Sequence, residues 1–185
     1  MLRVRARLNS FLERGVLALG WLRADRLRQW QRCRRLIFVC SGNICRSPYA
    51  QEAARRHGIA AVSCGTHTNN GLPAEAAAIR EAARRGVDLS AHRTTKWEDV
   101  VVEEGDVIVA MQLRHALSVL PRARAQAYPV VMFSSLLPGF TTVRDPYGRP
   151  DEHFREVFDL IDAGIAQFAR LQGGRLPTPP LVERN

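Results

Sequence analysis

A short apolar run, LIFVC at residues 36–40, leads through a glycine-containing turn into the segment SPYAQEAARRHG, residues 47–58. A run this short and apolar is typical of a strand that is buried on both faces. Pro48 near the start of the next segment and Gly58 at its end are typical boundaries of a helix. The stretch therefore predicts a buried strand, a tight polar turn and a helix in direct succession.

The same alternation continues as far as residue 174. Further strands are predicted at residues 61–65, 106–111 and 128–133, and further helices at residues 73–86, 94–105, 112–120 and 151–174. This order predicts an α/β fold with an open parallel sheet of about four strands and helices on both faces. Ligands of such sheets bind beyond the carboxyl ends of the strands, which is where Cys40 lies.

Charge divides the chain into unequal parts. Residues 1–35 hold ten arginines against two acidic residues, so this segment carries +8 of the net charge of +9. Its leucines fall near helical spacing, which predicts a basic amphipathic helix suited to an anionic membrane surface. A helix that docks on the domain or on a partner, or a start codon assigned upstream of the true one, is an alternative. Residues 36–173 are expected to form one nearly neutral domain and residues 174–185 a disordered tail, so no nucleic-acid binding is expected.

The cysteine content and the N-terminal sequence predict the compartment. Four cysteines at irregular spacing do not form the pattern of a disulfide scaffold. The apolar stretch VLALGWL is too short to span a bilayer, and no small-residue cleavage site follows it. We therefore expect a cytoplasmic protein with reduced thiols, and its basic extension offers a means of association with a membrane.

The turn after the first strand, CSGNICRSP at residues 40–48, has the chemistry of an oxyanion site. Backbone N–H groups ahead of a helix N-terminus form an anion cradle, and Gly42 lets the backbone approach a ligand closely. Asn43 tolerates left-handed backbone geometry, and Arg46 can return a bidentate guanidinium to an oxyanion. A thiol at this centre is stabilised as a thiolate, so Cys40 is the predicted nucleophile.

This loop resembles the phosphate loop of the low-molecular-weight protein tyrosine phosphatases, whose pattern is C-x-G-N-x-C-R-S-P. The resemblance extends over about residues 36–172 and includes SCGT, GVDLSAHR, the strand ending VAM, and DPYG. It implies a phosphomonoester hydrolase that acts on protein phosphotyrosine through a phosphocysteine intermediate. It also implies that neither a metal nor another cofactor is needed, because the loop and its arginine supply the positive field.

The resemblance assigns the chemistry to a few residues. Cys40 attacks phosphorus, and Arg46 holds the equatorial oxygens through the transition state. Asp145 protonates the leaving phenolate and then activates water, while Ser47 donates a hydrogen bond to the sulfur. The residues expected to line the phosphate are Ser41, Gly42, Asn43, Ile44, Cys45, Arg46 and Ser47.

The resemblance also implies supporting residues around the loop. Ser63 and His92, together with Asn43, match positions that hold the loop by hydrogen bonds. Tyr147 is expected to form a wall for the phenyl ring of the substrate, and Tyr49 is expected to add to the rim. The remaining histidines are expected on the surface: His57, His67, His115 and His153.

The three other cysteines differ in what they imply. Cys45 matches a cysteine that, in the family, forms a reversible disulfide with the nucleophile and protects it from over-oxidation. Cys33 and Cys64 are interpreted as incidental thiols.

Three departures from the family pattern leave the substrate open. The loop THTNNGLPA at residues 66–74 is polar where many relatives carry an aromatic or large apolar residue. Gln112 stands where many relatives have aspartate, and Thr95 where many have arginine. These changes are expected to loosen a supporting network without altering the chemistry.

Relatives of this fold supply the alternative functions. Arsenate reductases need a second cysteine pair downstream, and no cysteine follows Cys64. Protein-arginine phosphatases carry threonine where Ile44 stands, so isoleucine favours phosphotyrosine. A phosphate-binding regulatory module without catalysis is the third alternative. Bacterial relatives often oppose membrane tyrosine kinases, which makes such a kinase a candidate partner.

Overall fold

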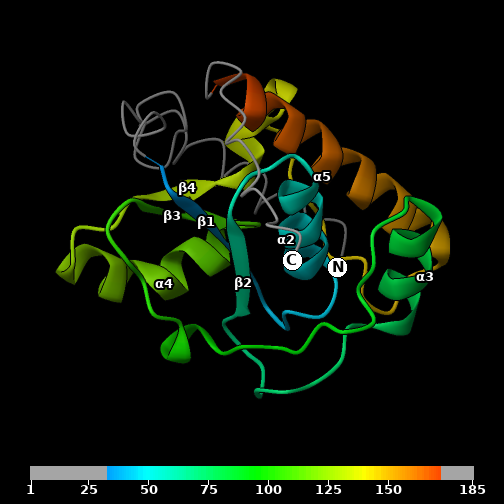
Figure 1. Cartoon of the computed structure of the whole chain (residues 1–185), viewed down its shortest axis with the longest axis horizontal. Helices are drawn as coiled ribbons and strands as arrows, with labels where there is room; N and C mark the ends of the chain where they lie inside the picture. The colour runs from blue at the N-terminus through cyan, green and yellow to red at the C-terminus, as the bar shows by residue number, and fades with distance from the viewer. Residues whose placement is uncertain (1–32, 172–185) are drawn as a thin grey trace, which may run out of the picture.

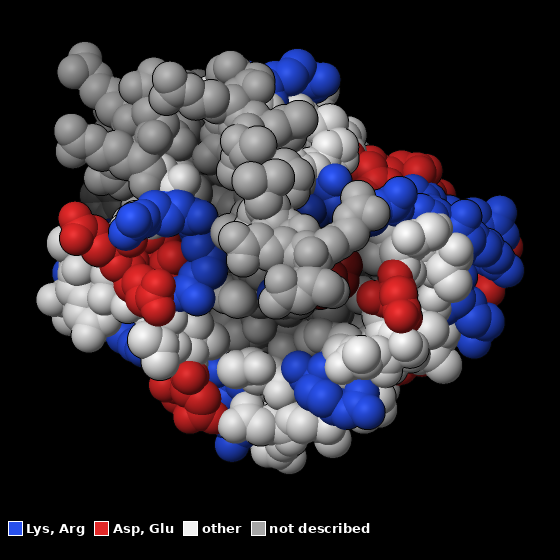
Figure 2. Space-filling model, viewed as in Figure 1, with Lys and Arg blue, Asp and Glu red and all other residues white. Residues whose placement is uncertain are grey.

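The computed structural model describes residues 33–171 of the 185-residue chain. The predicted basic extension, apart from its last three residues, and the predicted tail lie outside the described residues. Within residues 33–171, no helix is long and apolar enough to cross a membrane. Basic and acidic side chains are interspersed over the visible surface of the described part, in keeping with its near-neutral charge (Figure 2).

Four parallel strands form one sheet in the order β2-β1-β3-β4 (Figure 1). The central strands are β1 (Arg35–Cys40) and β3 (Asp106–Ala110), and the outer strands are β2 (Ala61–Gly65) and β4 (Val130–Met132). All strands point the same way, so the ends of β1 and β2 meet at one edge, where Cys40 pairs with Gly65. The predicted α/β fold with a four-stranded parallel sheet is confirmed.

Helices cover both faces of the sheet, as predicted (Figure 1). One face carries α2 (Arg46–Arg56), α3 (Ala76–Arg84) and α5 (Asp151–Leu171), and the other carries α4 (Leu113–Ala125).

Alternate residues of β1 supply the two cores. Leu36 and Phe38 pack with side chains of the three-helix face, whereas Ile37 and Val39 pack with those of α4. Successive strand side chains point to opposite faces, so a strand that is covered on both sides reads as one apolar run.

One difference from the expected elements is in α4, which was predicted to end before Pro121. The helix instead continues to Ala125 with Pro121 inside it. Because Pro121 has no backbone N–H, the carbonyl of Leu117, four residues earlier, lacks its helical hydrogen bond. Leu117 is exposed, so water can reach that carbonyl. Arg122 holds the following turn, because it donates to the carbonyls of Trp97 and Val100. Solvent access and this anchor together explain why the helix continues.

Other differences concern short 3₁₀ helices. The helix expected over residues 94–105 is limited to η3 (Trp97–Asp99). Two further turns that were not predicted, η4 (Phe133–Leu136) and η5 (Pro138–Phe140), follow β4 and lead toward Asp145.

Candidate active site

The strand β1 ends at Cys40 and α2 begins at Arg46, so residues 41–45 turn beneath a helix N-terminus. The Cys40 side chain is buried, and its Sγ accepts a hydrogen bond from the Asn43 backbone N–H at 3.2 Å. Ser47 Oγ lies 3.0 Å from the same sulfur. A sulfur atom that faces a backbone donor, a hydroxyl and a helix N-terminus is suited to carry negative charge.

Asn43 connects this turn to two other segments. Its φ of 54° is left-handed, a conformation that asparagine tolerates better than most residues. Its Nδ2 donates to Ser47 Oγ and Ser63 Oγ, both at 2.9 Å, and its Oδ1 accepts from the Thr95 backbone N–H at 2.8 Å. Its carbonyl oxygen accepts from His92 Nε2 at 2.7 Å. The structure thus brings Ser63 and His92 to the loop.

The same contacts limit the effect of one departure from the family pattern. Thr95 reaches Asn43 through its main chain, so the threonine side chain is not needed for this bond.

Burial lowers the pKa of His92, although its bond to the Asn43 carbonyl opposes that shift. A neutral ring that donates through Nε2 has the role of a structural hydrogen-bond donor.

Gly65, the last residue of β2, allows the loop to lie against this strand. A Cβ atom at this position would come within 2.6 Å of the Ser41 carbonyl oxygen and 2.8 Å of Thr68 Cγ2. Beyond the glycine, the Thr66 N–H donates to the Cys40 carbonyl at 3.0 Å, and the His67 N–H donates to the Ser41 carbonyl at 2.9 Å. The polar loop after β2 is therefore bonded directly to the turn that holds Cys40.

Arg46 is almost fully buried at the start of α2. Its Nη1 donates to Gln112 Oε1 at 3.0 Å and to the Val143 carbonyl at 3.3 Å, and its Nη2 lies 2.7 Å from Asp145 Oδ2. Its Nε has no hydrogen-bond partner within the part of the chain that the structure describes. Gln112, at a second departure from the family pattern, still orients the guanidinium through a neutral oxygen.

The predicted acid, Asp145, lies at the mouth of the site with a side chain that is 37% exposed. Its Oδ2 is shared by two guanidinium groups, Arg46 and Arg114, the latter at 3.2 Å. Two residues later, the Tyr147 side chain is 61% exposed. The structure thus brings Arg46, which closes the turn that holds Cys40, into contact with Asp145, and Tyr147 is open to solvent two residues later.

Tyr49 is not at the rim, and that prediction is wrong. Its side chain is buried, its ring stacks on Phe158 at a centroid distance of 3.7 Å, and its hydroxyl donates to Asp162 Oδ1 at 2.8 Å. Tyr49 follows Arg46 by three residues on α2 and lies on the side of that helix that packs against α5. Its role is to join α2 to α5.

His115 is also misplaced by the sequence interpretation, because it is buried rather than on the surface. Its Nε2 lies 2.9 Å from Ser41 Oγ in the loop. A signal for this position exists in the sequence, since His115, Val119 and Ala123 recur every four residues and all are buried on one face of α4. The other three histidines that were expected on the surface are exposed: His57, His67 and His153.

All four cysteines are free thiols. Cys45 is buried within the loop, and burial raises the pKa of its thiol, with the nearby Cys40 as the next cause. Burial raises the pKa of Cys64 as well. Burial also raises the pKa of Cys33, to about 12. These three are therefore neutral thiols rather than second nucleophiles.

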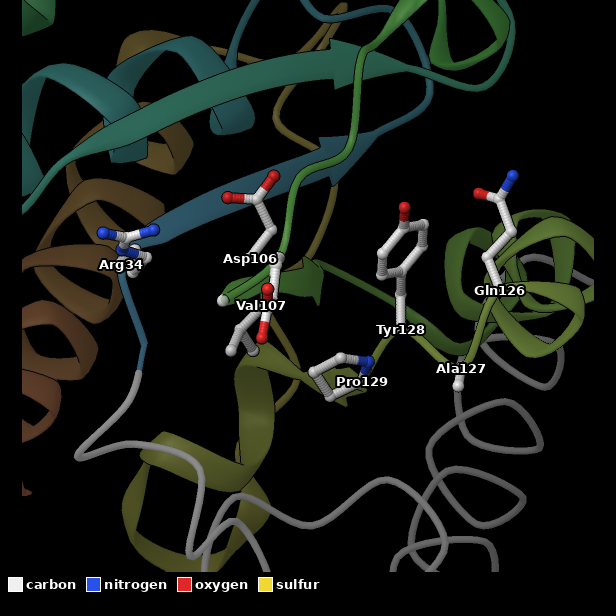
Figure 3. Close-up of a pocket in the computed structure, with 9 residues that line it drawn as sticks. Arg34, Asp106, Val107, Gln126, Ala127, Tyr128 and Pro129 are labelled. Carbon is white, nitrogen blue, oxygen red and sulfur yellow. The ribbon is translucent and has the colours of Figure 1, made fainter.

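A separate hollow of about 640 Å³ lies at the opposite end of the sheet (Figure 3). Arg34, Asp106 and Tyr128 line it, near the starts of β1, β3 and β4. Arg35 donates to both carboxylate oxygens of Asp106, at 3.0 and 2.6 Å, so that charge is already paired. The reactive groups gather instead at the carboxyl ends of the strands, as expected for this architecture.

Within residues 33–171, no group of three or more His, Cys, Asp or Glu side chains is placed to hold a metal ion. The positive field at the loop comes from Arg46, the backbone donors and the helix N-terminus.

Comparison with known proteins assigns the chain to a family. Residues 35–175 match the family model described as low molecular weight phosphotyrosine protein phosphatase. The probable low molecular weight protein-tyrosine-phosphatase EpsP of Ralstonia nicotianae is 30% identical over 70% of this chain and 90% of its own length. The protein-arginine-phosphatase of Geobacillus stearothermophilus is 28% identical over 73% of this chain and 93% of its own. Vibrio vulnificus Wzb, solved in complex with benzylphosphonate, matches with a TM-score of 0.65 and 25% identity, covering 75% of this chain and 99% of that one.

Proposed function

We propose that this chain removes phosphate from protein phosphotyrosine through a phosphocysteine intermediate. The chain belongs to the low molecular weight phosphotyrosine protein phosphatase family and is a phosphoric monoester hydrolase. One observation carries the proposal. A buried cysteine Sγ accepts from a loop N–H at 3.2 Å, and Arg46 of the same loop lies 2.7 Å from Asp145. Nucleophile, anion clamp and proton donor are thus within reach of one phosphate group.

In the first step, the Cys40 thiolate attacks phosphorus and forms the S–P bond as the P–O bond to the phenol breaks. Arg46 and the loop N–H groups stabilise the charge on the equatorial oxygens in the transition state. The proton of the Asp145 carboxylic acid passes to the leaving oxygen, so tyrosine departs as a neutral phenol.

In the second step, the Asp145 carboxylate takes a proton from water, and the water oxygen attacks phosphorus. The S–P bond breaks, inorganic phosphate leaves, and the thiolate is restored. Ser47 Oγ, 3.0 Å from the sulfur, stabilises the thiolate as it departs. The two steps use one carboxylate first as an acid and then as a base.

The test combines trapping with a substrate panel. Acid quenching after addition of a ³²P-labelled phosphotyrosine peptide should leave label on the wild-type protein and none on Cys40→Ser. Cys33→Ser is the matched control, and it should be labelled like the wild type because Cys33 lies outside the loop. Binding of the peptide to the wild type without label or turnover would support a phosphate-binding module instead, whereas label on Cys40→Ser would mean that phosphate is transferred to a group other than a cysteine thiolate at position 40.

The second candidate function is protein-arginine phosphatase. It is favoured by the similarity to the Geobacillus enzyme and by the polar loop at residues 66–74. Ile44, where arginine phosphatases carry threonine, opposes it. Phosphotyrosine, phosphoserine and phosphoarginine peptides of one sequence distinguish the candidates, and we expect turnover of phosphotyrosine to exceed the other two. Faster turnover of phosphoarginine would replace the first proposal with the second.

A redox role for Cys45 is part of the proposal. A sulfenic acid formed on Cys40 by peroxide would condense with the Cys45 thiol, releasing water and forming a disulfide that an added thiol reduces. After peroxide and then dithiothreitol, we expect the wild type to recover most of its activity and Cys45→Ser to recover little. Equal recovery of activity by the wild type and Cys45→Ser would contradict a protective role of Cys45. Cys64→Ser, which lacks another buried thiol, is the control and should recover like the wild type.

The setting of the enzyme is the last part of the proposal. The charge of +8 on residues 1–35 favours work beside an anionic membrane surface in the cytoplasm, where a membrane tyrosine kinase would be the opposing partner. The full chain should sediment with vesicles that contain phosphatidylglycerol and not with pure phosphatidylcholine vesicles. Absence of sedimentation with both would favour docking of the extension on the domain or on a protein partner.

A further inference from the structure

We propose that His115 is a positioning residue that connects the phosphate loop to the general acid. The proposal rests on the proposed phosphatase reaction and adds a residue to it. The loop carries the nucleophile Cys40, whereas the acid Asp145 lies more than a hundred positions later in the chain. The reaction needs both groups in one geometry, so a side chain that contacts both regions can set their spacing.

The contacts of His115 determine which ring nitrogen carries the proton. Arg114 Nε donates to His115 Nε2 at 3.2 Å, and an arginine N–H can only donate. His115 Nε2 therefore accepts, and the Ser41 hydroxyl, 2.9 Å away, donates to the same lone pair. The ring proton is then on Nδ1, which has no hydrogen-bond partner within residues 33–171.

The environment keeps this ring in its accepting form. Burial, with the charges of Arg46 and Arg114 as the next causes, lowers the pKa of His115 to about 2. The imidazole is consequently neutral over the whole range in which the enzyme would work. A neutral Nε2 is a constant acceptor for one donor from the loop and one from Arg114.

Arg114 extends the contact to the acid. Its Nη2 lies 3.2 Å from Asp145 Oδ2, the same oxygen that lies 2.7 Å from Arg46 Nη2. A closed path therefore runs from Ser41 through His115 and Arg114 to Asp145, and returns to the loop through Arg46. His115 is the one buried, uncharged member of this path, and both of its contacts use a single atom.

The path makes a specific chemical prediction. Without His115, Ser41 loses its acceptor, which should weaken the binding of inorganic phosphate to the loop. Arg114 also loses the group that fixes its guanidinium, so Asp145 should be less well placed to give its proton. Loss of proton donation slows poor leaving groups more than good ones, because a good leaving group departs without a proton.

The experiment compares His115→Ala, His115→Gln and the exposed control His153→Ala in the full chain. The measurements are kcat/KM for aryl phosphates from p-nitrophenyl phosphate to phenyl phosphate, and the inhibition constant of inorganic phosphate. For His115→Ala we expect a loss of about 10–100-fold with phenyl phosphate, a smaller loss with p-nitrophenyl phosphate, and phosphate inhibition weakened several-fold. His115→Gln, whose amide oxygen can accept both bonds, should recover part of each loss, and His153→Ala should match the wild type.

The Arg114→Ala variant tests the acid arm if His115→Ala does not fold. Arg114 is exposed, so its removal should leave the fold intact and still give the larger loss with phenyl phosphate. Equal losses with all leaving groups, or no rescue by glutamine, would overturn the inference. A wild-type protein without activity on any aryl phosphate would instead overturn the proposed function.

Discussion

The phosphate loop and the Asp145–Tyr147 segment belong to one site but are held in different ways. Asn43 and Ser47 in the loop have no exposed surface, and Asn43 alone bonds to five other residues. Asp145 is 37% exposed, and the Tyr147 ring is 61% exposed. In the proposed reaction, the loop performs steps that are the same for every phosphate ester, whereas the exposed segment meets the group that differs between substrates. A largely buried loop held by many hydrogen bonds and an open rim are suited to these separate tasks.

Removal of the acid should give the largest difference between the two regions. Asp145→Ala should slow hydrolysis of phenyl phosphate by about 10²–10⁴-fold, because the phenolate must then leave without a proton. The loss with p-nitrophenyl phosphate should be smaller, and a plot of log kcat/KM against leaving-group pKa should steepen. Asp145→Asn is the matched variant of equal shape, and it should behave alike. An identical loss for every leaving group would show that Asp145 is not the acid.

Removal of the Asn43 side chain, which supports the loop, should lower stability and should slow all substrates by a similar factor. Asn43→Ala deletes the amide that bonds Ser47, Ser63 and the Thr95 backbone, and it places alanine at a φ of 54°. Unpaired buried groups and left-handed alanine should lower the free energy of unfolding by about 2–4 kcal/mol.

Urea denaturation measures that loss, and Asn69→Ala, in an exposed loop, is the control. Activity of Asn43→Ala should fall by a similar factor for all leaving groups. A loss that depends on the leaving group would contradict the separation between loop and rim.

Removal of the rim ring should have the smallest effect. Tyr147→Ala should raise KM for a phosphotyrosine peptide by about fivefold, because an aromatic contact of about 1 kcal/mol is lost. Tyr147→Phe keeps the ring and should match the wild type. No change in KM for Tyr147→Ala would mean that another residue forms the wall, and the polar loop at residues 66–74 would be the next region to vary.

Local patterns in the sequence were sufficient to predict the sheet and the loop. The apolar runs that form β1 and β3 are typical of strands that are covered on both faces, and both strands are buried in the sheet. The loop residues are consecutive, and their resemblance to a known phosphate loop places Cys40, Asn43 and Arg46 without knowledge of distant contacts. The choice of Asp145 as the acid also came from that resemblance. Local patterns could not have placed it, because the turns η4 and η5, which lead from β4 toward Asp145, were not predicted.

The errors concern side chains whose position depends on packing between distant elements. Tyr49 was placed at the rim because it follows the loop, but its neighbour in space is Phe158 on α5. His115 was placed on the surface because it forms no metal-ligand spacing with the other histidines, but α4 turns it toward Ser41. Pro121 was interpreted as a helix end, although solvent and Arg122 allow the helix to continue. In each case a tertiary contact outweighs the local preference.

Gly65 has a consequence for anyone who wishes to move this loop into another protein. The nine residues from Cys40 to Pro48 cannot be transplanted alone, because the Ser41 carbonyl lies where any side chain at position 65 would begin. A host scaffold would need a parallel neighbouring strand that ends in glycine opposite the cysteine, with Ser63 two residues earlier on that strand. The smallest segment that can be transferred therefore contains the ends of both β1 and β2 together with the loop. Recombination experiments should keep these two strand ends on the same fragment.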